Sequence, residues 1–391
     1  MMRNITKIIV SFIFCFVQLS GPIAYAELSS QVNAKVSAQL VNAPSAILME
    51  QSSGQVLYEL EADKKLPIAS VTKSMTMLLI MEALDFGKIK YTDMVTTSEH
   101  AASMGGSQVF LEVGEQMSVN DMLKAIAVAS GNDAAVAMAE FIAGTEPAFV
   151  EMMNKRAAEL GCKNTHFINC NGLDETAEHY STARDIAIIS CELLKHPKIQ
   201  EYTSIWMDTL RDGAFGLSNT NKLIRFYKGA NGIKTGSTST AKYCLSASAK
   251  RDGMQLVAVV LGAPTTADRF GSATRLLDYG FANYSVVNCA EKVGKLEPLP
   301  VIGGKEDTVS AEADKSVNFI VKKGNSDKVE SKTTIDEPLR APIKKGQKIG
   351  EATLSVGGEK LAKCDIKATT EVKRMDAIEM YVRLLQKMLC M

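Results

Sequence analysis

The chain has 391 residues, 46% of them hydrophobic, with 44 basic and 44 acidic side chains and a formal net charge of zero. This length and composition are typical of a globular protein with a sizeable core and about two domains. A balanced charge provides no field that steers a polyanion, and the sequence contains no basic run or cluster of stacking aromatic residues. We therefore expect no nucleic-acid partner.

The amino-terminal segment differs in composition from the rest. Arg3 and Lys7 precede an apolar run from Ile8 to Leu19, and a small-residue Ala-Tyr-Ala site ends at Ala26. This order is typical of a secretory signal peptide, residues 1–26, which is removed from the exported chain. An uncleaved anchor is the weaker alternative, because the run is shorter than the roughly 20 residues that a spanning helix needs.

Residues 27–285 are predicted to form one α/β domain. Two strand-like runs joined by a Ser-Gly turn lie between Ser45 and Leu60, and Asp252-Gly253 joins two more near the end. These strands are expected to pair in one antiparallel sheet with helices packed on it. Apolar spacing predicts helices over residues 71–86, 119–129, 133–142, 147–160, 182–194 and 267–281, and strands over residues 232–235, 243–249 and 255–261.

The carboxy-terminal part begins near Glu291, where short alternating runs are separated by Gly, Lys and Asp clusters. This pattern predicts a small all-β domain over residues 296–372, without a set of residues typical of catalysis. Residues 374–391 place apolar side chains on one half of a helical wheel and charged ones on the other, which predicts an amphipathic helix. The pattern leaves open whether this helix packs on protein or lies on a membrane surface; it is too short and too charged to span.

Eight cysteines are scattered along the chain, and seven remain once Cys15 is removed with the signal peptide. The odd number and irregular spacing predict free, partly buried thiols rather than a disulfide framework. Cys162, His166 and Cys170 are metal-ligand types spaced four apart. Neighbouring Gly and Asn residues favour a loop that would not align them, so we expect no metal site there.

A serine and a lysine, Ser70 and Lys73, lie three residues apart where the helix over residues 71–86 is predicted to begin. Side chains at this helical spacing have Cβ atoms roughly 5–6 Å apart, so the amine could take the hydroxyl proton. Free N–H groups at the helix start would stabilise an oxyanion beside the serine. The lysine must be neutral, which requires a pKa lowered from about 10.4 to about 7 or 8. The alternative is an ordinary helix-start serine and an exposed lysine.

Two further short motifs contain residue types that suit the same chemistry. Ser130-Gly131-Asn132 interrupts two helical runs, and its alternative interpretation is a plain helix–helix turn. Lys234-Thr235-Gly236 falls on a predicted strand, where it offers a cation for a carboxylate, a hydroxyl, and room for close approach of a ligand. An edge-strand lysine is the alternative there. The order and structural contexts of the three motifs favour one shared catalytic site.

The trio Ser-x-x-Lys, Ser-x-Asn and Lys-Thr-Gly resembles the motifs of penicillin-binding proteins and class A β-lactamases. The chain specifically resembles a low-molecular-mass penicillin-binding protein, a serine-type D-alanyl-D-alanine carboxypeptidase, over almost its whole length. The stretches SGNDAAVAMAE, NTHFINCNGLDE and NGIKTGSTSTA all look like that family. The resemblance implies an α/β catalytic domain of the penicillin-binding protein/β-lactamase type over residues 27–285, a small β-sandwich domain over 296–372 and a membrane-associating helix over 374–391.

The resemblance also assigns a role to each motif residue. Ser70 would be the acylated nucleophile, Lys73 its general base, and Ser130 the relay of a proton to the leaving amine. Asp185, outside the motifs, would brace the floor of the site. Substrate binding would involve Asn132 for the substrate amide, Lys234 and Thr235 for its carboxylate, and Gly236 and Ser237 on the same strand. The main-chain N–H groups of Ser70 and Ser237 would form the oxyanion hole.

Two departures from the class A β-lactamase pattern bear on the activity. Gly131 stands where that pattern has Asp, and no Glu-x-x-Leu-Asn segment occurs between Ile142 and Asp185. Rapid antibiotic hydrolysis is therefore not expected. None of the four histidines needs a catalytic role, because lysine replaces histidine as the base of a Ser-Lys pair.

The resemblance implies an exported enzyme, peripheral to the outer face of the cytoplasmic membrane, in the periplasm or cell-wall space. It would remove the terminal D-Ala of peptidoglycan stem pentapeptides through a Ser70 ester, bind β-lactam antibiotics covalently, and need no metal or organic cofactor. The alternatives are a D,D-endopeptidase, a β-lactamase, and a non-catalytic envelope scaffold whose β domain docks partners.

Overall fold

The computed structural model describes residues 40–173 and 176–389. The predicted signal peptide, residues 1–26, lies outside the described residues, as does Cys390. Within the described ranges, no helix combines the length and the apolar composition needed to cross a bilayer. The described residues divide into two compact units, one made of residues 40–48, Tyr58–Ser248 and Ala258–Leu277, the other of Met49–Leu57, Ala249–Val257 and residues 278–389.

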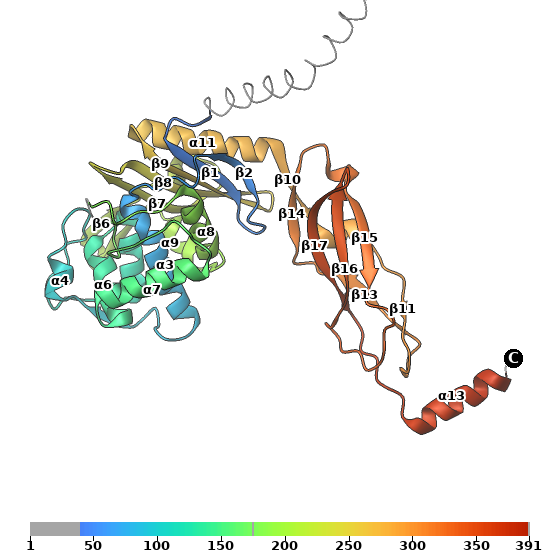
Figure 1. The fold of residues 1–391 in the computed structure, drawn as a ribbon. Coiled ribbons are helices and arrows are strands. Elements are labelled where there is room, and N and C mark those ends of the chain that lie inside the picture. The colour runs from blue at the N-terminus through green and yellow to red at the C-terminus, as the bar shows by residue number, and fades with distance from the viewer. Residues whose placement is uncertain (1–39, 174–175, 390–391) are drawn as a thin grey trace, which may run out of the picture. The chain divides into compact units, whose positions relative to one another are not determined.

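A central sheet organises residues 45–263 of the chain. It has five strands in the order β2 (Val56–Leu60), β1 (Ser45–Glu50), β9 (Met254–Ala263), β8 (Lys242–Arg251) and β7 (Ala230–Thr238). The sheet joins strands from both ends of the predicted domain, as expected (Figure 1). At the turn between β8 and β9, Asp252 and Gly253 both have positive φ, which is the conformation that a tight hairpin turn requires.

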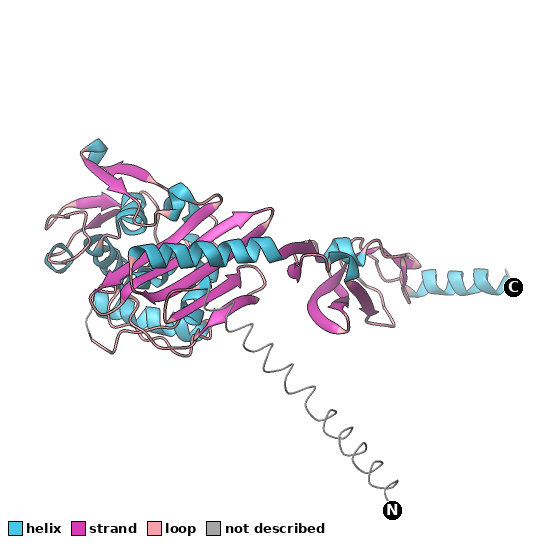
Figure 2. Ribbon diagram, turned by 90° about the horizontal axis from the view of Figure 1, so that it is seen from above, coloured by secondary structure: helices cyan, strands magenta, loops and turns pink. Residues whose placement is uncertain are grey.

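Helices cover both faces of this sheet, close to the predicted positions. They are α3 (Lys73–Asp85), α5 (Val119–Lys124), α6 (Asn132–Ala143), α7 (Glu146–Glu159), α8 (Ala183–Leu193) and α11 (Thr266–Asn283). α11 lies along one face, and α3, α6, α7 and α8 lie on the other (Figures 1 and 2). The side chains of Ser118, Thr145 and Thr182 cap the starts of α5, α7 and α8 by accepting a main-chain N–H bond. α3 is buried on nearly every side, which places its first residues in the interior.

Short elements connect these helices. A π-helical segment, Ala125–Ala129, continues α5 and completes the helix predicted over residues 119–129. The apolar spacing did not predict the others, which are α4 (Glu99–Ala102), α9 (Ile199–Thr203), α10 (Leu223–Phe226), the paired strands β3 (Met94–Thr96) and β4 (Gln116–Ser118), and the hairpin of β5 (Met207–Leu210) and β6 (Phe215–Ser218). Such elements are too short to show a hydrophobic period.

The first turn of the helix predicted over residues 71–86 is not α-helical. Residues Ala69–Thr72 form a 3₁₀ turn, and α3 begins at Lys73. Ala69 has a φ of 48°, in the left-handed region, which interrupts the right-handed helix just before Ser70. Ser70 therefore lies on a tight turn that leads into α3, and Lys73 is the first residue of the helix.

The second unit contains the β domain. Its four-stranded antiparallel sheet has the order β13 (Ala311–Ala313), β17 (Glu359–Ala368), β16 (Lys348–Val356) and β15 (Glu330–Ile335). Two antiparallel pairs accompany it, β10 (Tyr284–Asn288) with β14 (Asn318–Lys322) and β11 (Leu299–Pro300) with β12 (Thr308–Val309). The expected small all-β domain is confirmed. Helix α13, Ala377–Leu389, follows it.

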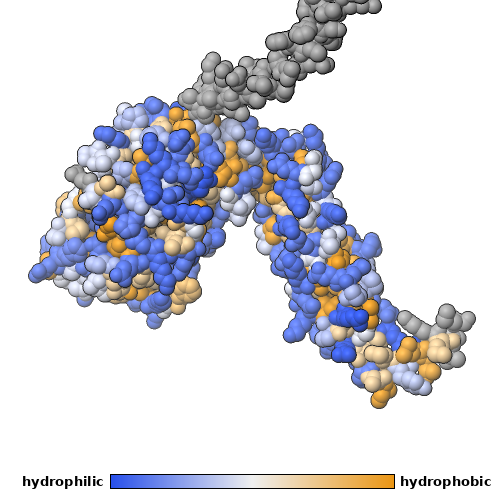
Figure 3. Space-filling view, viewed as in Figure 1, coloured by the Kyte–Doolittle hydropathy of each residue, from blue (hydrophilic) through white to orange (hydrophobic). Residues whose placement is uncertain are grey.

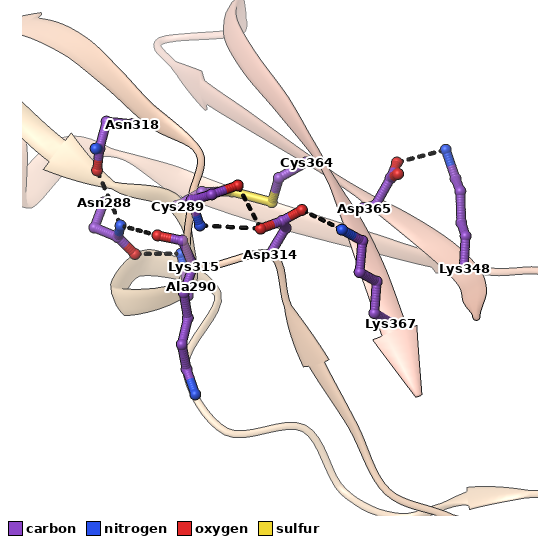
Figure 4. The surroundings of a disulfide bond; sticks show 11 residues. Asn288, Cys289, Ala290, Asp314, Lys315, Asn318, Lys348, Cys364, Asp365 and Lys367 are labelled. Carbon is purple, nitrogen blue, oxygen red and sulfur yellow. Dashed lines mark hydrogen bonds and ion pairs between the residues drawn. A yellow bond between two sulfur atoms is a disulfide. The ribbon is translucent and has the colours of Figure 1, made fainter. Parts of the chain in front are cut away.

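A disulfide joins Cys289, the first residue of α12 (Cys289–Val293), to Cys364 on β17 (Figure 4). The prediction of free thiols was therefore wrong for these two cysteines. They are 75 residues apart, and they meet because the fold places α12 against β17, so their spacing carries no signal. Among the described residues, the cysteines that form no disulfide are Cys162, Cys170, Cys191 and Cys244, and all four are buried.

Candidate active site

The structure brings the predicted nucleophile and base into contact. Lys73 Nζ lies 3.1 Å from Ser70 Oγ. Lys73 is fully buried, whereas Ser70 is half-buried, so the hydroxyl reaches solvent and the amine does not. Burial disfavours the charged amine and lowers the pKa of Lys73 to about 7. The amine is therefore available as a neutral base near neutral pH.

The Lys73 amine has two further partners. Its Nζ lies 2.5 Å from Asn132 Oδ1 and 2.7 Å from the main-chain oxygen of Asn171. A neutral amine carries two protons and one lone pair. It can donate both protons to these two oxygens and accept the Ser70 hydroxyl proton with the lone pair. The three contacts thus match what a neutral lysine base needs.

Asn171 was not predicted as a site residue. It lies in a loop that Asn169 holds, because the Asn169 side-chain oxygen accepts the N–H groups of Asn171 and Gly172. Gly172 has a φ of 79°, and a Cβ there would lie 2.0 Å from the Ala69 carbonyl oxygen. Glycine is therefore required where this loop meets the 3₁₀ turn Ala69–Thr72, the nucleophile turn, which carries Ser70. The Asn171-Gly172 pair is a turn signal that could have indicated this loop, but a main-chain contact from Asn171 leaves no side-chain signature.

The second motif lies at the predicted junction between helices. Ser130 is buried with a φ of 65°, directly after the π-helical segment. A left-handed serine in the interior is conformationally costly, and such residues cluster at functional sites. Asn132 begins α6, and its side chain joins the Lys73 amine to the main-chain oxygen of Gly105, 2.7 Å away. Asn132 therefore brings the second motif to the first.

The third motif lies on β7. Lys234 is fully buried, and its Nζ donates to the main-chain oxygen of Thr235 at 3.0 Å. Burial, with the positive charges of Lys73 and Arg269, holds the pKa of Lys234 well below its usual range. The Thr235 hydroxyl donates to the Thr220 hydroxyl at 2.7 Å. The influence of Lys73 on Lys234 places the two lysines in one electrostatic environment.

β7 passes close to the nucleophile turn at Gly236. A Cβ on this residue would lie 2.7 Å from the Ile68 carbonyl oxygen and 2.9 Å from the Ser70 main-chain nitrogen. A side chain there would push the strand away from the turn, so glycine is required. Ser237 follows on β7 with an exposed side chain. The Ser70 N–H therefore lies beside the strand segment that carries Ser237, an arrangement that can form an oxyanion hole.

Arg269, on α11, is a further residue that the sequence reasoning missed. Its buried guanidinium donates to the main-chain oxygens of Gly236 and Cys244 at 3.2 and 3.3 Å. It thereby fixes the backbone of the motif strand and adds a positive charge near Lys234. A single arginine within an amphipathic helix pattern gives no signal of such a role.

Two other sequence predictions concern residues outside the motifs. The Asp185 carboxylate accepts hydrogen bonds from the Asn164 N–H and the Thr165 hydroxyl at 2.9 and 2.8 Å, so it braces the segment that leads to the Asn-rich loop. Cys162 and His166 each contact a main-chain oxygen. Among the described residues, no three His, Cys, Asp or Glu side chains are grouped in a way that could hold a metal ion.

Comparison with known proteins agrees with this fold and site. The sequence matches the D-alanyl-D-alanine carboxypeptidase family over residues 32–265, and the C-terminal domain of penicillin-binding protein 5 over residues 284–374. The class defined in this way is that of serine-type peptidases that bind penicillin. The chain belongs to the D-alanyl-D-alanine carboxypeptidase family.

Relatives align along most of both chains. The protein is 48% identical to the D-alanyl-D-alanine carboxypeptidase DacF of Bacillus subtilis, with 85% of this chain and 86% of the relative covered. It is 36% identical to DacC of Escherichia coli, with coverage of 88% and 87%. The structure of penicillin-binding protein 5 from Haemophilus influenzae superposes with a TM-score of 0.74 at 35% identity, covering 85% of this chain and 98% of that one. The family and the serine-type carboxypeptidase activity expected from the motifs are confirmed, and none of the alternative activities is favoured.

Proposed function

We propose that this enzyme removes the terminal D-Ala of peptidoglycan stem pentapeptides through an acyl-enzyme on Ser70. The observation that carries the proposal is the 3.1 Å contact between Ser70 Oγ and the buried Lys73 amine. An alcohol is a weak nucleophile until a base removes its proton, and a lysine with a pKa of about 7 can do so near neutral pH.

The reaction at Ser70 proceeds through acylation and then hydrolysis. Lys73 accepts the Ser70 proton as Oγ forms a bond to the carbonyl carbon of the penultimate D-Ala. The carbonyl electron pair moves onto its oxygen, which the N–H groups of Ser70 and Ser237 stabilise. Collapse of this intermediate breaks the C–N bond; Ser130 gives its hydroxyl proton to the leaving amine and takes in exchange the proton that Lys73 accepted, so Lys73 is neutral again. Lys73 then accepts a proton from water as the water oxygen attacks the ester, and returns it to Ser70 Oγ when the ester bond breaks.

Recognition of the substrate terminus falls to the third motif and to Asn132. The substrate ends in a carboxylate, for which Lys234 supplies a positive charge and Thr235 a hydroxyl. The Asn132 side chain, already held by Lys73 and Gly105, orients the substrate amide. A β-lactam combines a reactive amide with a carboxylate at a similar separation, and this accounts for covalent penicillin binding at the same serine.

Intact-mass measurement after exposure to labelled penicillin tests the nucleophile. We expect one label on the native enzyme, located on Ser70 by peptide mapping, and none on Ser70→Ala. Ser74→Ala is the matched control, because it makes the same change one turn away in α3, where the buried Ser74 hydroxyl has no hydrogen-bond partner in the described structure. Label that persists in Ser70→Ala would overturn the assignment.

For the location of the enzyme, we propose export directed by residues 1–26 and a peripheral hold on the outer face of the cytoplasmic membrane through residues 374–391. The apolar side chains of α13 are between 41% and 77% exposed at Ile378, Tyr381, Val382, Leu385 and Met388. Figure 3 shows this hydrophobic surface on α13. Glu379 and Arg383 instead pair with Lys305 and Asp307. An exposed apolar face beside a tethered polar face supports an interfacial helix.

Deletion of residues 374–391 tests this location. We expect the truncated enzyme to leave the membrane fraction and keep its penicillin acylation rate. The segment has three basic and two acidic side chains, a net charge of about one, so release by salt alone should be weak. Serine substitutions at Ile378 and Leu385 should also release the enzyme, whereas Gln386→Ser on the same helix should not. A truncated enzyme that still sediments with membranes, or that unfolds, would favour packing of α13 on protein.

A further inference from the structure

We infer that His179 is a positioning residue that fixes the orientation of the Ser70 main-chain N–H through the hydroxyl of Thr72. The inference rests on the proposed function, in which this N–H is one of the two oxyanion-hole donors. Neither His179 nor Thr72 belongs to the three sequence motifs. Both are buried behind the nucleophile turn, with 3% and 0% exposure.

The hydrogen bonds of His179 define the tautomer of its ring. The main-chain N–H of Ile168 donates to His179 Nδ1 at 3.3 Å. A main-chain N–H can only donate, so Nδ1 accepts with its lone pair and the proton of the neutral imidazole is on Nε2. Nε2 lies 2.7 Å from Thr72 Oγ1 and therefore donates to it. Phe167 holds the ring in an edge-to-face contact, with centroids 5.8 Å apart.

The Thr72 hydroxyl links the His179 ring to the turn that carries Ser70. Its oxygen accepts the proton of His179 Nε2, and its own proton is donated to the Ala69 carbonyl oxygen at 2.8 Å. In this series of three hydrogen bonds, from Ile168 through His179 and Thr72 to Ala69, every donor therefore meets an acceptor. The Ala69 carbonyl is thus held from inside the protein by a hydroxyl whose rotation His179 restricts.

The Ala69 carbonyl and the Ser70 N–H belong to the same peptide group. That group is planar and trans, so its C=O and N–H point in opposite directions. A hydrogen bond that holds the Ala69 oxygen therefore directs the Ser70 N–H to the other side, toward β7, where a Cβ added to Gly236 would lie 2.9 Å from the Ser70 main-chain nitrogen. Ala69 has a φ of 48°, which is unfavourable for an L-residue and would relax without such a restraint.

This arrangement explains why the nucleophile turn needs a buried hydroxyl and a buried imidazole. The 3₁₀ turn satisfies few of its own main-chain groups, and the peptide that precedes Ser70 must keep one orientation through acylation and hydrolysis. Misalignment of a catalytic donor by a fraction of an ångström weakens its bond to the oxyanion. His179 thus acts on the reaction through Thr72 and the Ala69–Ser70 peptide, not by touching the substrate.

Two pairs of variants in the full-length enzyme test the inference. Thr72→Val keeps the side-chain shape but loses the hydroxyl, and Thr72→Ser retains it. His179→Phe loses the donor, and His179→Gln can place an amide N–H near the position of Nε2. We expect Thr72→Val and His179→Phe to slow acylation by labelled penicillin about 10- to 100-fold, less than the roughly 10²- to 10³-fold cost of removing an oxyanion-hole donor, because the donor is displaced and not lost. Thr72→Ser and His179→Gln should recover most of the rate.

An infrared measurement separates positioning from a merely structural role. The ester carbonyl of the acylated enzyme is polarised by oxyanion-hole donors, so its stretching frequency should rise in Thr72→Val and His179→Phe but not in the two conservative variants. The double variant should be no slower than either single one. Unchanged acylation, or slow acylation with an unchanged carbonyl frequency in folded variants, would overturn the inference. Failure of the proposed function is distinct, because the native enzyme itself would then carry no label on Ser70.

Discussion

The two halves of this protein differ in what they bury. Between residues 40 and 277, charged side chains such as Lys73, Lys234 and Arg269 have almost no exposure. Between residues 278 and 389, the described structure buries no charged residue and no Ser, Thr, Asn or Gln; its core consists of apolar side chains and the Cys289–Cys364 disulfide. Burial of a charge costs stability unless it is compensated. Charged side chains that are nevertheless buried in one region therefore indicate that they serve the reaction there at a cost in stability.

The backbone shows the same contrast. All described non-glycine residues with positive φ lie before residue 253, and they include Ala69 and Ser130 at the active site. Strained conformations of this kind persist where the surrounding contacts enforce them, and they are frequent at functional sites. The β domain has no such residue among those described, and its strands follow regular antiparallel pairings with two irregularities between β16 and β17. Mutations should therefore change reaction rates in the first region and stability in the second.

Replacement of Lys73, the proposed base, should give the largest effect. We expect Lys73→Ala to lower the penicillin acylation rate by about 10² to 10⁴, because loss of a general base typically has this cost. The variant should remain folded, since removal of a buried amine also removes its desolvation penalty. Stopped-flow acylation with circular dichroism as the folding check measures both quantities. Lys155→Ala on the exposed side of α7 is the control and should match the native enzyme; an unchanged rate in Lys73→Ala would assign the base elsewhere.

Removal of the disulfide should give the next largest effect, on stability alone. The bond closes a loop of 75 residues, and its loss should lower the free energy of unfolding of the β domain by about 2–5 kcal/mol. We expect the double variant Cys289→Ala/Cys364→Ala to acylate at the native rate. Denaturant unfolding with and without reductant provides the measurement.

Cys191, which forms no disulfide, provides the matched control for the Cys289–Cys364 bond. Cys191→Ala removes one buried thiol from α8 and breaks no covalent link. Its unfolding should respond to reductant as the native enzyme does, whereas the double variant should not respond. A drop in the acylation rate of the double variant would show that the β domain influences catalysis, which would contradict the expected effect on stability alone.

The pH dependence of acylation should be a roughly tenfold effect. With a Lys73 pKa of about 7, the neutral fraction of this base rises about tenfold between pH 6 and pH 8. The acylation rate should therefore rise with pH through this window. The charge of Lys73 is among the causes that lower the pKa of Lys234, so deprotonation of Lys73 helps Lys234 to keep its charge for the substrate carboxylate. A rate that is flat from pH 6 to pH 8 would contradict a Lys73 base.

Much of this fold was predictable because its signals are local. Caps at Ser118, Thr145 and Thr182, the Asp252-Gly253 turn and the apolar spacing of the long helices all act within a few residues. The 3₁₀ turn at Ala69–Thr72 was not predictable in this way, because a left-handed alanine depends on contacts from distant loops. Tertiary context decides such conformations against local propensity.

The same distinction between local and long-range signals applies to the candidate active site. Side chains with short motif spacing, such as Ser70 with Lys73, could be recognised from the sequence, and the structure places them in contact. Asn171 contributes a main-chain oxygen, and Arg269 and His179 reach the site from separate segments, so none of the three leaves a periodic or spaced pattern. The Cys289–Cys364 disulfide was not predicted for a similar reason: the two cysteines are 75 residues apart, and the whole fold is needed to bring them together.

The smallest expected effect concerns Asn288, the N-cap residue of α12 beside the disulfide (Figure 4). Its Oδ1 accepts the Ala290 N–H at 3.0 Å, and its Nδ2 donates to the Lys315 main-chain oxygen and to Asn318 Oδ1, each at 2.9 Å. Loss of such a cap costs about 1 kcal/mol of unfolding free energy. We expect Asn288→Ala to have this effect on the β domain with no change in acylation. Asn288→Asp is the matched control, because it keeps the capping acceptor and loses the two donated bonds.

A double-mutant cycle between the cap and the disulfide sharpens this last prediction. In the native enzyme the disulfide already fixes the first residue of α12 to β17, so fraying at the helix start is restricted. Without the disulfide, that end is held by the hydrogen bonds of Asn288 and by the bond from the Cys289 N–H to the Val317 main-chain oxygen, so each of them matters more. Asn288→Ala should therefore cost more in the Cys289→Ala/Cys364→Ala background than in the native one, as neighbouring interactions are seldom additive. Equal costs in both backgrounds would mean that the cap and the disulfide stabilise the β domain independently, and that the disulfide acts only through the unfolded chain.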